Sequence, residues 1–418
     1  MSFILKLFKS KVFKNIGLYT VLNLFNAIIP FLLIPFFTAE LSKEEYGVID
    51  MFNTSSLILM PLVGLNIGAS VIRFYYDKDI DVRKLLSTSI NFTFVSSFAV
   101  IVLFVSVTLI FNLWNLYIII ALLALGYSCF SQISEILLSY FRATENPRAF
   151  GIFRISKTFT DFGISVFIIL YVYSGWEARV FSAVLISFLF SLISLFFLLR
   201  KELYSHSVFD KGLLKECLLY SSPLIIHSIS GYLMSYGDRY LILKYFDIGQ
   251  VGVYGVASQI GLLMAFVSNS LNQAWTPHMF KVLSSSNVVA IKKMLRLNYF
   301  FCLFFVFLAV FIYLMIPFIY KFVIHGNYVL DFKIVGIIVL GYCFNSFYKI
   351  FVNIMFYFKK SSLLSLYMLL CAILNFVLAW YLLPILGLLG SAIASCITFV
   401  VQFVLVYYQY VNLIKKKI

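Results

Sequence analysis

Charged residues are scarce in this sequence. Only 12% of its 418 residues are charged, whereas 62% are hydrophobic and 19% aromatic, and the mean hydropathy is +1.00. A soluble domain carries roughly a quarter charged residues. The shortage of charge leaves too little polar surface to cover a string of soluble domains. Lipid is therefore the expected solvent for most of the chain.

Metal and nucleic-acid signatures are missing as well. The six cysteines lie singly within apolar runs and form no CxxC pair, which favours small buried side chains over disulfides or metal ligands. The net charge of +15 comes from short Lys and Arg clusters between apolar runs, not from one basic face. Without zinc spacing or aromatic–basic interleaving, the sequence argues against a nucleic-acid partner. We expect no metal and no cofactor.

Long apolar runs are what the sequence has instead. A helix needs roughly 20 apolar residues to cross about 30 Å of hydrocarbon. The first run extends to about Thr38, beyond the roughly 7–15 residues of a signal-peptide core, so we expect it to remain as a membrane helix. The runs predict twelve transmembrane helices joined by short loops: 15–38, 46–75, 85–111, 116–141, 150–173, 178–199, 215–245, 251–280, 293–318, 333–357, 361–383 and 386–411.

The basic residues predict the orientation of these helices. With the N-terminus in the cytoplasm, most of the 32 Lys and Arg residues fall on the inner side, as the positive-inside rule requires for short loops. We therefore expect both termini in the cytoplasm. The basic residues on the outer side are Lys43, Arg179, Arg239, Lys244, Lys321 and Lys333.

A weak internal repeat divides the chain. Tyr46-Gly47-Val48 recurs as Tyr254-Gly255-Val256, and Leu65-Asn66 recurs as Leu271-Asn272, about half a chain later. Six helices per half preserve the direction of the chain. We therefore predict an all-α integral membrane protein with two six-helix bundles, residues 1–205 and 206–418, related by a pseudo-two-fold axis along the membrane normal. A polar seam between two such bundles suits a transporter that works by alternating access.

Polar residues inside the spans are the candidate functional residues. A charge at the bilayer centre costs at least about 2.5–3.5 kcal/mol, so such residues are expected to face a bundle interior or a hydrated cavity. A basic collar at the inner end would suit an anionic head group such as a pyrophosphate. The alternative is a set of interfacial cations and internal salt bridges. The ionisable candidates are Asp50, Lys157, Asp161, Asp238, Arg239 and Lys349, and the collar is Arg73, Arg142 and Arg154.

Two pairings are hypotheses at this stage. Lys157 and Asp161 are four residues apart on one helix and can pair with each other. Arg239 could approach Asp50 across the seam and help to close an outer gate. Helix breakers predict bends that could serve gating or packing alone: Pro30 and Pro35 in the first span, Pro61, Gly64 and Gly68 in the second, and Pro223 in the seventh.

Three segments carry a family resemblance. Tyr236-Gly-Asp238-Arg239-Tyr-Leu-Ile, Val251-Gly-Val-Tyr254-Gly-Val and Ala274-Trp275-Thr-Pro277, with Glu44-Glu45-Tyr46-Gly47-Val48 near the N-terminus, resemble the polysaccharide exporter family. More narrowly, the chain is similar to Wzx-type O-antigen flippases of the multidrug/oligosaccharidyl-lipid/polysaccharide superfamily. The resemblance implies a multi-pass protein of the bacterial inner membrane that moves undecaprenyl-pyrophosphate-linked repeat units from the cytoplasmic to the outer leaflet.

The resemblance also implies site residues and partners. In that family the first, second, seventh and eighth spans line a central cavity, which places Asp50, Asn53, Asp238, Arg239, Gln259 and Asn272 near it. The implied partners are the lipid-linked oligosaccharide, membrane lipids and other polysaccharide-assembly proteins. Relatives suggest coupling to an ion gradient, for which Asp50, Asp161 and Asp238 are the acids to test.

Two other functions stay open. A drug or cation antiporter of the same superfamily would share the architecture and carry a small substrate. A membrane enzyme of glycan assembly would need convergent catalytic groups, typically in a large loop. The sequence has no long outer loop with paired carboxylates and no phosphate-cradling motif, so we do not expect an enzyme.

Overall fold

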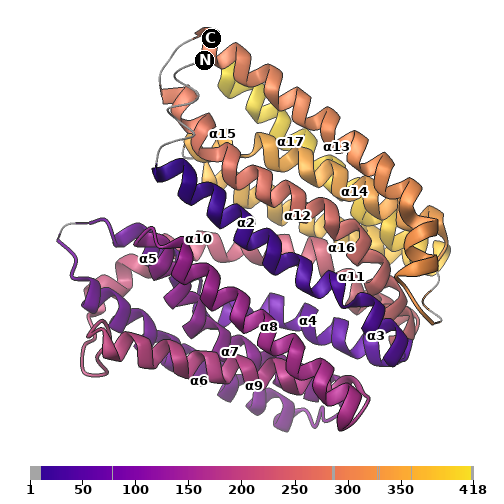
Figure 1. Cartoon of the computed structure of the whole chain (residues 1–418), viewed down its shortest axis with the longest axis horizontal. Helices are drawn as coiled ribbons and strands as arrows, with labels where there is room; N and C mark the ends of the chain where they lie inside the picture. Colours follow the sequence, from indigo (N-terminus) through magenta and orange to yellow (C-terminus); the bar gives the residue numbers. More distant parts are fainter. Residues whose placement is uncertain are drawn as a thin grey trace. The chain divides into compact units, whose positions relative to one another are not determined.

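The computed structural model describes residues 11–77, 79–284, 288–326, 328, 330–358 and 360–415. These residues form helices without a strand among them (Figure 1). Eleven helices in the described chain are long and apolar enough to span a membrane. The predicted fifth span is helix α8 (Pro147–Tyr171), which is long enough but carries several charges, Lys157 and Asp161 among them. The predicted all-helical membrane fold is thus confirmed. The basic termini, Lys6, Lys9, Lys416 and Lys417, lie outside the described residues.

The chain forms two compact units. The first consists of Met1–Gly47 and Leu233–Ile418, and the second of Val48–Tyr232. The chain therefore passes between units within two helices, after Gly47 in α4 (Lys43–Gly64) and after Tyr232 in α10 (Lys211–Tyr236). The predicted bundles, residues 1–205 and 206–418, follow the sequence repeat and stay a prediction.

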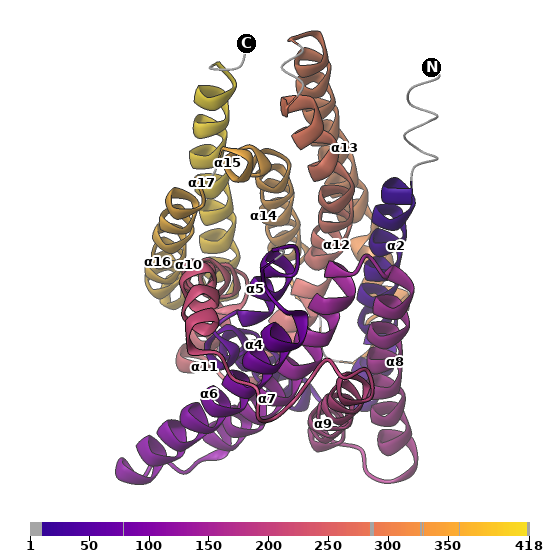
Figure 2. The ribbon, with the colours of Figure 1, turned by 90° about the vertical axis from the view of Figure 1, so that its left-hand side faces the viewer.

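The unit Val48–Tyr232 is organised around α7. This helix lies along α9 and packs against α5, α6 and α8 (Figure 2). Small and polar residues at the contacts allow close approach of the helices, as is usual in membrane bundles. The further helices of this unit are α5 (Ile67–Phe74), α6 (Val82–Ile110), α7 (Leu116–Ala143) and α9 (Trp176–Arg200).

The other unit is organised around α17 and α14. Helix α17 lies along both α14 and α16, and α12 packs against α14 and α2. Its helices are α2 (Lys11–Leu32), α3 (Ile34–Glu40), α11 (Asp238–Tyr245), α12 (Ile248–Ser284), α13 (Val288–Phe322), α14 (Phe332–Phe351), α15 (Asn353–Tyr357), α16 (Ser361–Leu386) and α17 (Leu388–Lys415).

The second span bends where its sequence predicts. Helices α4 and α5 are separated by Leu65 and Asn66, which both have positive φ, 45° and 53°. Gln132 of α7 donates to the Met60 carbonyl beside the bend, and the Asn66 amide donates to the Ser228 hydroxyl at 3.1 Å. Gln132 thus makes an interhelical hydrogen bond.

The seventh span breaks at a different residue from the one predicted. Pro223 lies inside α10, whereas the helix ends before Gly237. A Cβ on Gly237 would lie 2.5 Å from the Leu233 carbonyl oxygen, which explains the need for glycine at the break. This break places Asp238 and Arg239 in the first turn of α11.

Large apolar side chains cover the outside of the helices. Phe98, Phe159 and Phe307 are each at least 70% exposed, whereas serine and threonine recur in the buried positions. A water-soluble protein would bury such rings. The distribution is that of a protein whose surface faces lipid.

Candidate functional site

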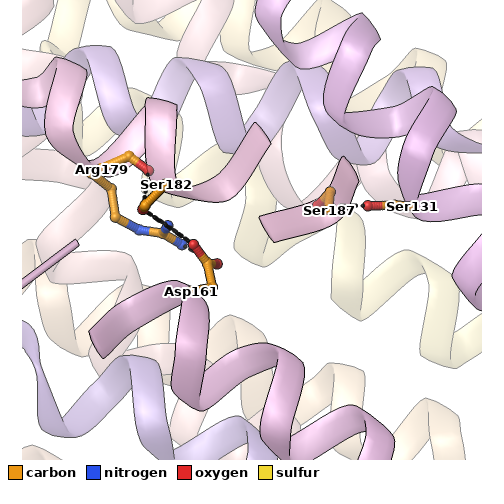
Figure 3. Close-up of polar contacts among 5 residues, drawn as sticks. All are labelled: Ser131, Asp161, Arg179, Ser182 and Ser187. Carbon is orange, nitrogen blue, oxygen red and sulfur yellow. Dashed lines mark hydrogen bonds and ion pairs between the residues drawn. The ribbon is translucent and has the colours of Figure 1, made fainter. Parts of the chain in front are cut away.

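A buried ion pair joins α8 and α9. The Arg179 guanidinium contacts both carboxylate oxygens of Asp161, at 2.7 and 3.2 Å, and the Ser182 hydroxyl donates to Asp161 at 3.2 Å (Figure 3). The Arg179 guanidinium carbon also lies 4.1 Å from the centre of the Phe162 ring. The two charged side chains are 9% and 14% exposed. A bidentate pair with a third hydrogen bond offsets much of the cost of burying both charges.

This pair replaces one that was predicted from the sequence. Arg179, counted from the sequence among the basic residues of the outer side, has a buried side chain. Asp161 was a possible partner of Lys157 on the same helix, but its ion pair is with Arg179. The sequence did contain a signal for this pair, because Arg179 lies on α9, the helix that follows α8, and has the opposite charge to Asp161.

Lys157 has hydroxyl and aromatic partners. Its ammonium group donates to the Ser131 hydroxyl at 3.2 Å and lies 5.7 Å from the centre of the Tyr127 ring. Ser131 in turn donates to Ser187 of α9 at 3.2 Å (Figure 3). Among the described residues, no carboxylate lies within ion-pair distance of Lys157. Its positive charge is therefore not neutralised by direct contact.

The second ion pair lies in the other unit and involves adjacent residues. The Arg239 guanidinium donates to Asp238 at 2.6 Å, and the Ser391 hydroxyl of α17 donates to the other carboxylate oxygen at 2.7 Å. Both charged side chains are 2% exposed. The Arg239 guanidinium also lies 5.3 Å from the Tyr236 ring and 5.2 Å from the Tyr254 ring. Arg239 is thus held within its own unit.

The predicted approach of Arg239 to Asp50 stays a prediction. Asp50 belongs to the unit Val48–Tyr232, where it is 5% exposed. Both side chains are buried. This agrees with the expectation that charged residues within the spans avoid the lipid.

Lys349 belongs to a polar stripe between α12 and the α14–α15 segment. Its ammonium group donates to Ser268 at 3.2 Å, and the Asn353 amide donates to Asn272 at 2.5 Å. Thr276, one turn further along α12, donates to the Asn272 carbonyl at 2.7 Å. No carboxylate lies within ion-pair distance of Lys349 among the described residues.

The structure therefore brings Lys349 and Asn272 together, as a shared site requires. It adds Ser268, Asn353 and Thr276, which the sequence analysis did not select. Their signal was a four-residue spacing, Ser268–Asn272–Thr276 and Lys349–Asn353, which places each set on one helix face. Gln259 is half-buried and lies nearer the start of α12.

The members of the predicted basic collar have separate partners. Arg73 pairs with Asp77 at 2.9 Å. Arg142 lies 3.7 Å from Glu135, and both Arg142 and Arg154 lie over the Phe150 ring, at 5.7 and 5.6 Å. Ion pairing at Arg73 favours the interfacial interpretation for that residue. Asn53, the remaining predicted cavity residue, is exposed.

Comparisons with solved structures show the fold. Two solved transporters of the MATE family, one described as inward-facing and one as outward-facing, share the fold with TM-scores of 0.66 and 0.65 at 14% and 13% identity. They match 95% and 98% of this chain and 96% and 98% of theirs. A MOP-superfamily transporter from Pyrococcus furiosus, reported with a binding pocket of reverse polarity, gives 0.64 at 12% identity over 98% of both chains. The fold is that of a MOP-superfamily membrane transporter.

Sequence relatives give the family. The model of the polysaccharide biosynthesis protein family matches residues 12–283, and the chain belongs to this family. A Haemophilus influenzae protein of the Lsg locus is 25% identical over 282 residues, which cover 67% of this chain and 68% of the relative. A membrane protein of the same organism is 20% identical over 278 residues, 66% and 67% of the two chains.

Proposed function

We propose that this protein is a flippase for undecaprenyl-pyrophosphate-linked oligosaccharide repeat units. It would move them from the cytoplasmic to the outer leaflet of a bacterial inner membrane by alternating access, as a step in O-antigen or lipopolysaccharide assembly. Both chain termini would lie in the cytoplasm. The match to the polysaccharide biosynthesis family supports a glycan precursor as the substrate.

One observation carries the proposal, namely which charges in the membrane helices are neutralised. Arginines pair with the carboxylates of Asp161 and Asp238, at 2.7 and 2.6 Å. Lys157 and Lys349 instead have serine partners, and no described carboxylate lies within ion-pair distance of either. Within the described membrane helices, each unit thus contains a lysine that has no carboxylate within ion-pair distance. An anionic head group would supply the missing charge and repay the cost of keeping ammonium groups in the membrane.

The amides beside Lys349 suit a hydroxyl-rich substrate. Asn272 is half-buried and has donor positions beyond the bond that it accepts from Asn353. Asn353 is 2% exposed, and its amide also donates to the Lys349 carbonyl at 3.4 Å. A glycan could use the donor positions of Asn272 next to a pyrophosphate held by the lysine. This arrangement supports an oligosaccharide linked to an anionic lipid over a purely apolar substrate.

A drug or cation antiporter is the second candidate function. The likeness to MATE transporters favours it, because the fold is common to both functions. Such a protein would need an available carboxylate for its cationic substrate. Tight, saturable binding of tailless cationic compounds to the purified protein would support the antiporter, and binding only of lipid pyrophosphates would exclude it.

Deletion of the gene tests the flippase directly. We expect loss of the surface glycan and accumulation of lipid-linked repeat units in the inner leaflet, both reversed by the unmodified gene. Normal surface glycan in a strain without a redundant transporter would contradict the proposal. Coupling to an ion gradient is part of the proposal. Asp161 and Asp238 are held in ion pairs with arginines, so Asp50→Asn is the variant that tests the coupling.

A further inference from the structure

We propose that a groove along α10 binds the pyrophosphate and the first isoprenoid units of the lipid-linked substrate in the cytoplasmic leaflet, before transport begins. The inference deepens the proposed function and rests on it. The groove has a volume of about 390 Å³. Its lining comes from one helix: Lys211, Leu214, Lys215, Leu218, Leu219 and Ser222.

These residues form one face of α10. Lys211, Lys215 and Leu219 follow each other at intervals of four residues, with Leu219 66% exposed. The other face packs inward, where Cys217 is 1% exposed and Ser221 is fully buried. The orientation of the groove is therefore set by packing of the buried face within the unit Val48–Tyr232.

Contacts within that unit hold α10 in place. The Tyr220 and Phe74 rings meet edge to face with centres 6.1 Å apart. Further along, the Asn66 amide donates to the Ser228 hydroxyl at 3.1 Å. These two contacts connect α10 with α5 and with the bend before it in the same unit.

The segment before α10 is tied to α6. The Ser205 amide donates to the Ser87 hydroxyl at 2.9 Å, and the Asn91 amide donates to the carbonyls of His206 and Val208 at 3.1 and 3.0 Å. The backbone N–H of Asp210 donates to Thr88 at 3.1 Å. These hydrogen bonds fix the start of α10 at Lys211 relative to α6.

Two acidic residues adjoin the groove lysines in the sequence, Asp210 and Glu216. Glu216 is not among the residues that line the groove, and Asp210 is engaged by other partners. Asp210 accepts the Leu213 backbone N–H at 3.0 Å, and its other oxygen lies 3.7 Å from Lys84. The Leu213 hydrogen bond lowers the pKa of the Asp210 carboxyl, so it stays ionised and bound to these partners. Neither partner is a groove lysine.

Charge and shape together select the occupant. Two ammonium groups one helical turn apart match a pyrophosphate, which carries more charge than a single phosphate ester. Beyond them the leucines run along the helix, and Lys211 to Ser222 spans about 16 Å. A surface one helix face wide suits a single isoprenoid chain better than the paired acyl chains of a phospholipid. The positive-inside rule places the lysines at the cytoplasmic interface, where the substrate is loaded.

Binding of geranylgeranyl pyrophosphate to the full-length protein in phosphatidylcholine nanodiscs tests the inference. We expect Lys211→Gln with Lys215→Gln to weaken binding at least about tenfold. The control is Arg200→Gln with Lys201→Gln, which removes two exposed charges at the end of α9 in the same unit, and we expect less than a twofold change. Leu219→Asn should weaken binding of the prenyl compound without changing that of inorganic pyrophosphate. A melting temperature within about 2 °C of the unmodified protein would establish that each variant is folded.

The outcomes separate the groove from the proposed function. Unchanged affinity in the Lys211/Lys215 double variant, with binding retained by the unmodified protein, would overturn the groove alone. Equal weakening by the α9 control would also overturn it, because charge at any nearby position would then suffice. Competition by phosphatidylglycerol at equal concentration would assign the groove to membrane phospholipid instead. Absence of binding to the unmodified protein would overturn the groove and the flippase together.

Discussion

Gly47 of α4 and Gly252 of α12 lie in reciprocal contact. A Cβ on Gly47 would lie 1.9 Å from the Ile248 carbonyl oxygen, and a Cβ on Gly252 would lie 2.0 Å from the Lys43 carbonyl oxygen. Both glycines belong to the same compact unit. In the structure Gly47 lies beside Gly252. In the sequence repeat the residue equivalent to Gly47 is Gly255. The first turns of α4 and α12 thus approach so closely that only glycine fits at either position.

Alanine at this crossing should disrupt it. In Gly47→Ala or Gly252→Ala the new methyl group would meet backbone atoms that cannot rotate away. We expect a loss of about 1–3 kcal/mol of stability, the usual cost of overpacking, and a clear drop in the melting temperature. The control is Gly126→Ala in α7, because a Cβ there has no neighbour within 4 Å. Equal melting temperatures for all three variants would contradict the close approach.

Tyr328 fastens the corner between α3 and α4. Its hydroxyl lies 2.8 Å from the Leu41 carbonyl and 2.7 Å from the Ser42 carbonyl, while Ser42 and Glu45 cap the start of α4 reciprocally. Burial raises the pKa of the Tyr328 phenol, so the hydroxyl remains a donor at alkaline pH. We expect Tyr328→Phe to cost about 1–3 kcal/mol, because buried carbonyls lose their donor.

Thermal unfolding in detergent measures this contribution. Tyr408→Phe removes a hydroxyl from a 63% exposed ring and serves as the control. An ordinary phenol ionises near pH 10, so the raised pKa predicts that the difference between Tyr328→Phe and the unmodified protein persists to about pH 11. A difference that vanished between neutral pH and about pH 11 would show that the phenol ionises there, against the account.

The Asp161–Arg179 pair should be structural in character. Removing one partner leaves an uncompensated buried charge, so Arg179→Gln or Asp161→Asn should destabilise the protein by about 3–5 kcal/mol. The double variant removes both charges and should recover much of that loss. A double-mutant cycle of melting temperatures measures the coupling. Additive losses would mean that the two side chains do not interact.

Much of the fold follows from the sequence, and its breaks follow less well. Apolar runs predict the spans because lipid permits only closed backbone hydrogen bonding, and Pro61 with Gly64 predicts the bend before Asn66. The break at Gly237 was not predicted, because Pro223 is the stronger helix-breaking signal in the sequence and yet lies inside α10. The local sequence shows which residues disfavour a helix. The packing of neighbouring helices determines at which residue the helix breaks.

The site was partly predictable for a similar reason. The cost of charge in lipid selected Lys157, Asp161, Asp238, Arg239 and Lys349, and each has polar partners inside its unit. This cost does not predict which residues pair, because pairing depends on which faces the neighbouring helices turn toward each other. Arg179 was counted on the outer side by its place in the chain, and only its packing against α8 shows that its side chain is buried.

Lys157 and Lys349, which have no described carboxylate within ion-pair distance, give the most direct test of the central claim. The measurement is translocation of a fluorescent lipid-linked repeat unit by the purified protein in liposomes, compared between the unmodified protein, Lys157→Gln, Lys349→Gln and an Arg73→Gln control. We predict that each lysine variant lowers the initial rate at least about tenfold with an unchanged melting temperature, while the control stays within about twofold. Full transport by both lysine variants would contradict the claim that these cations hold the anionic head group.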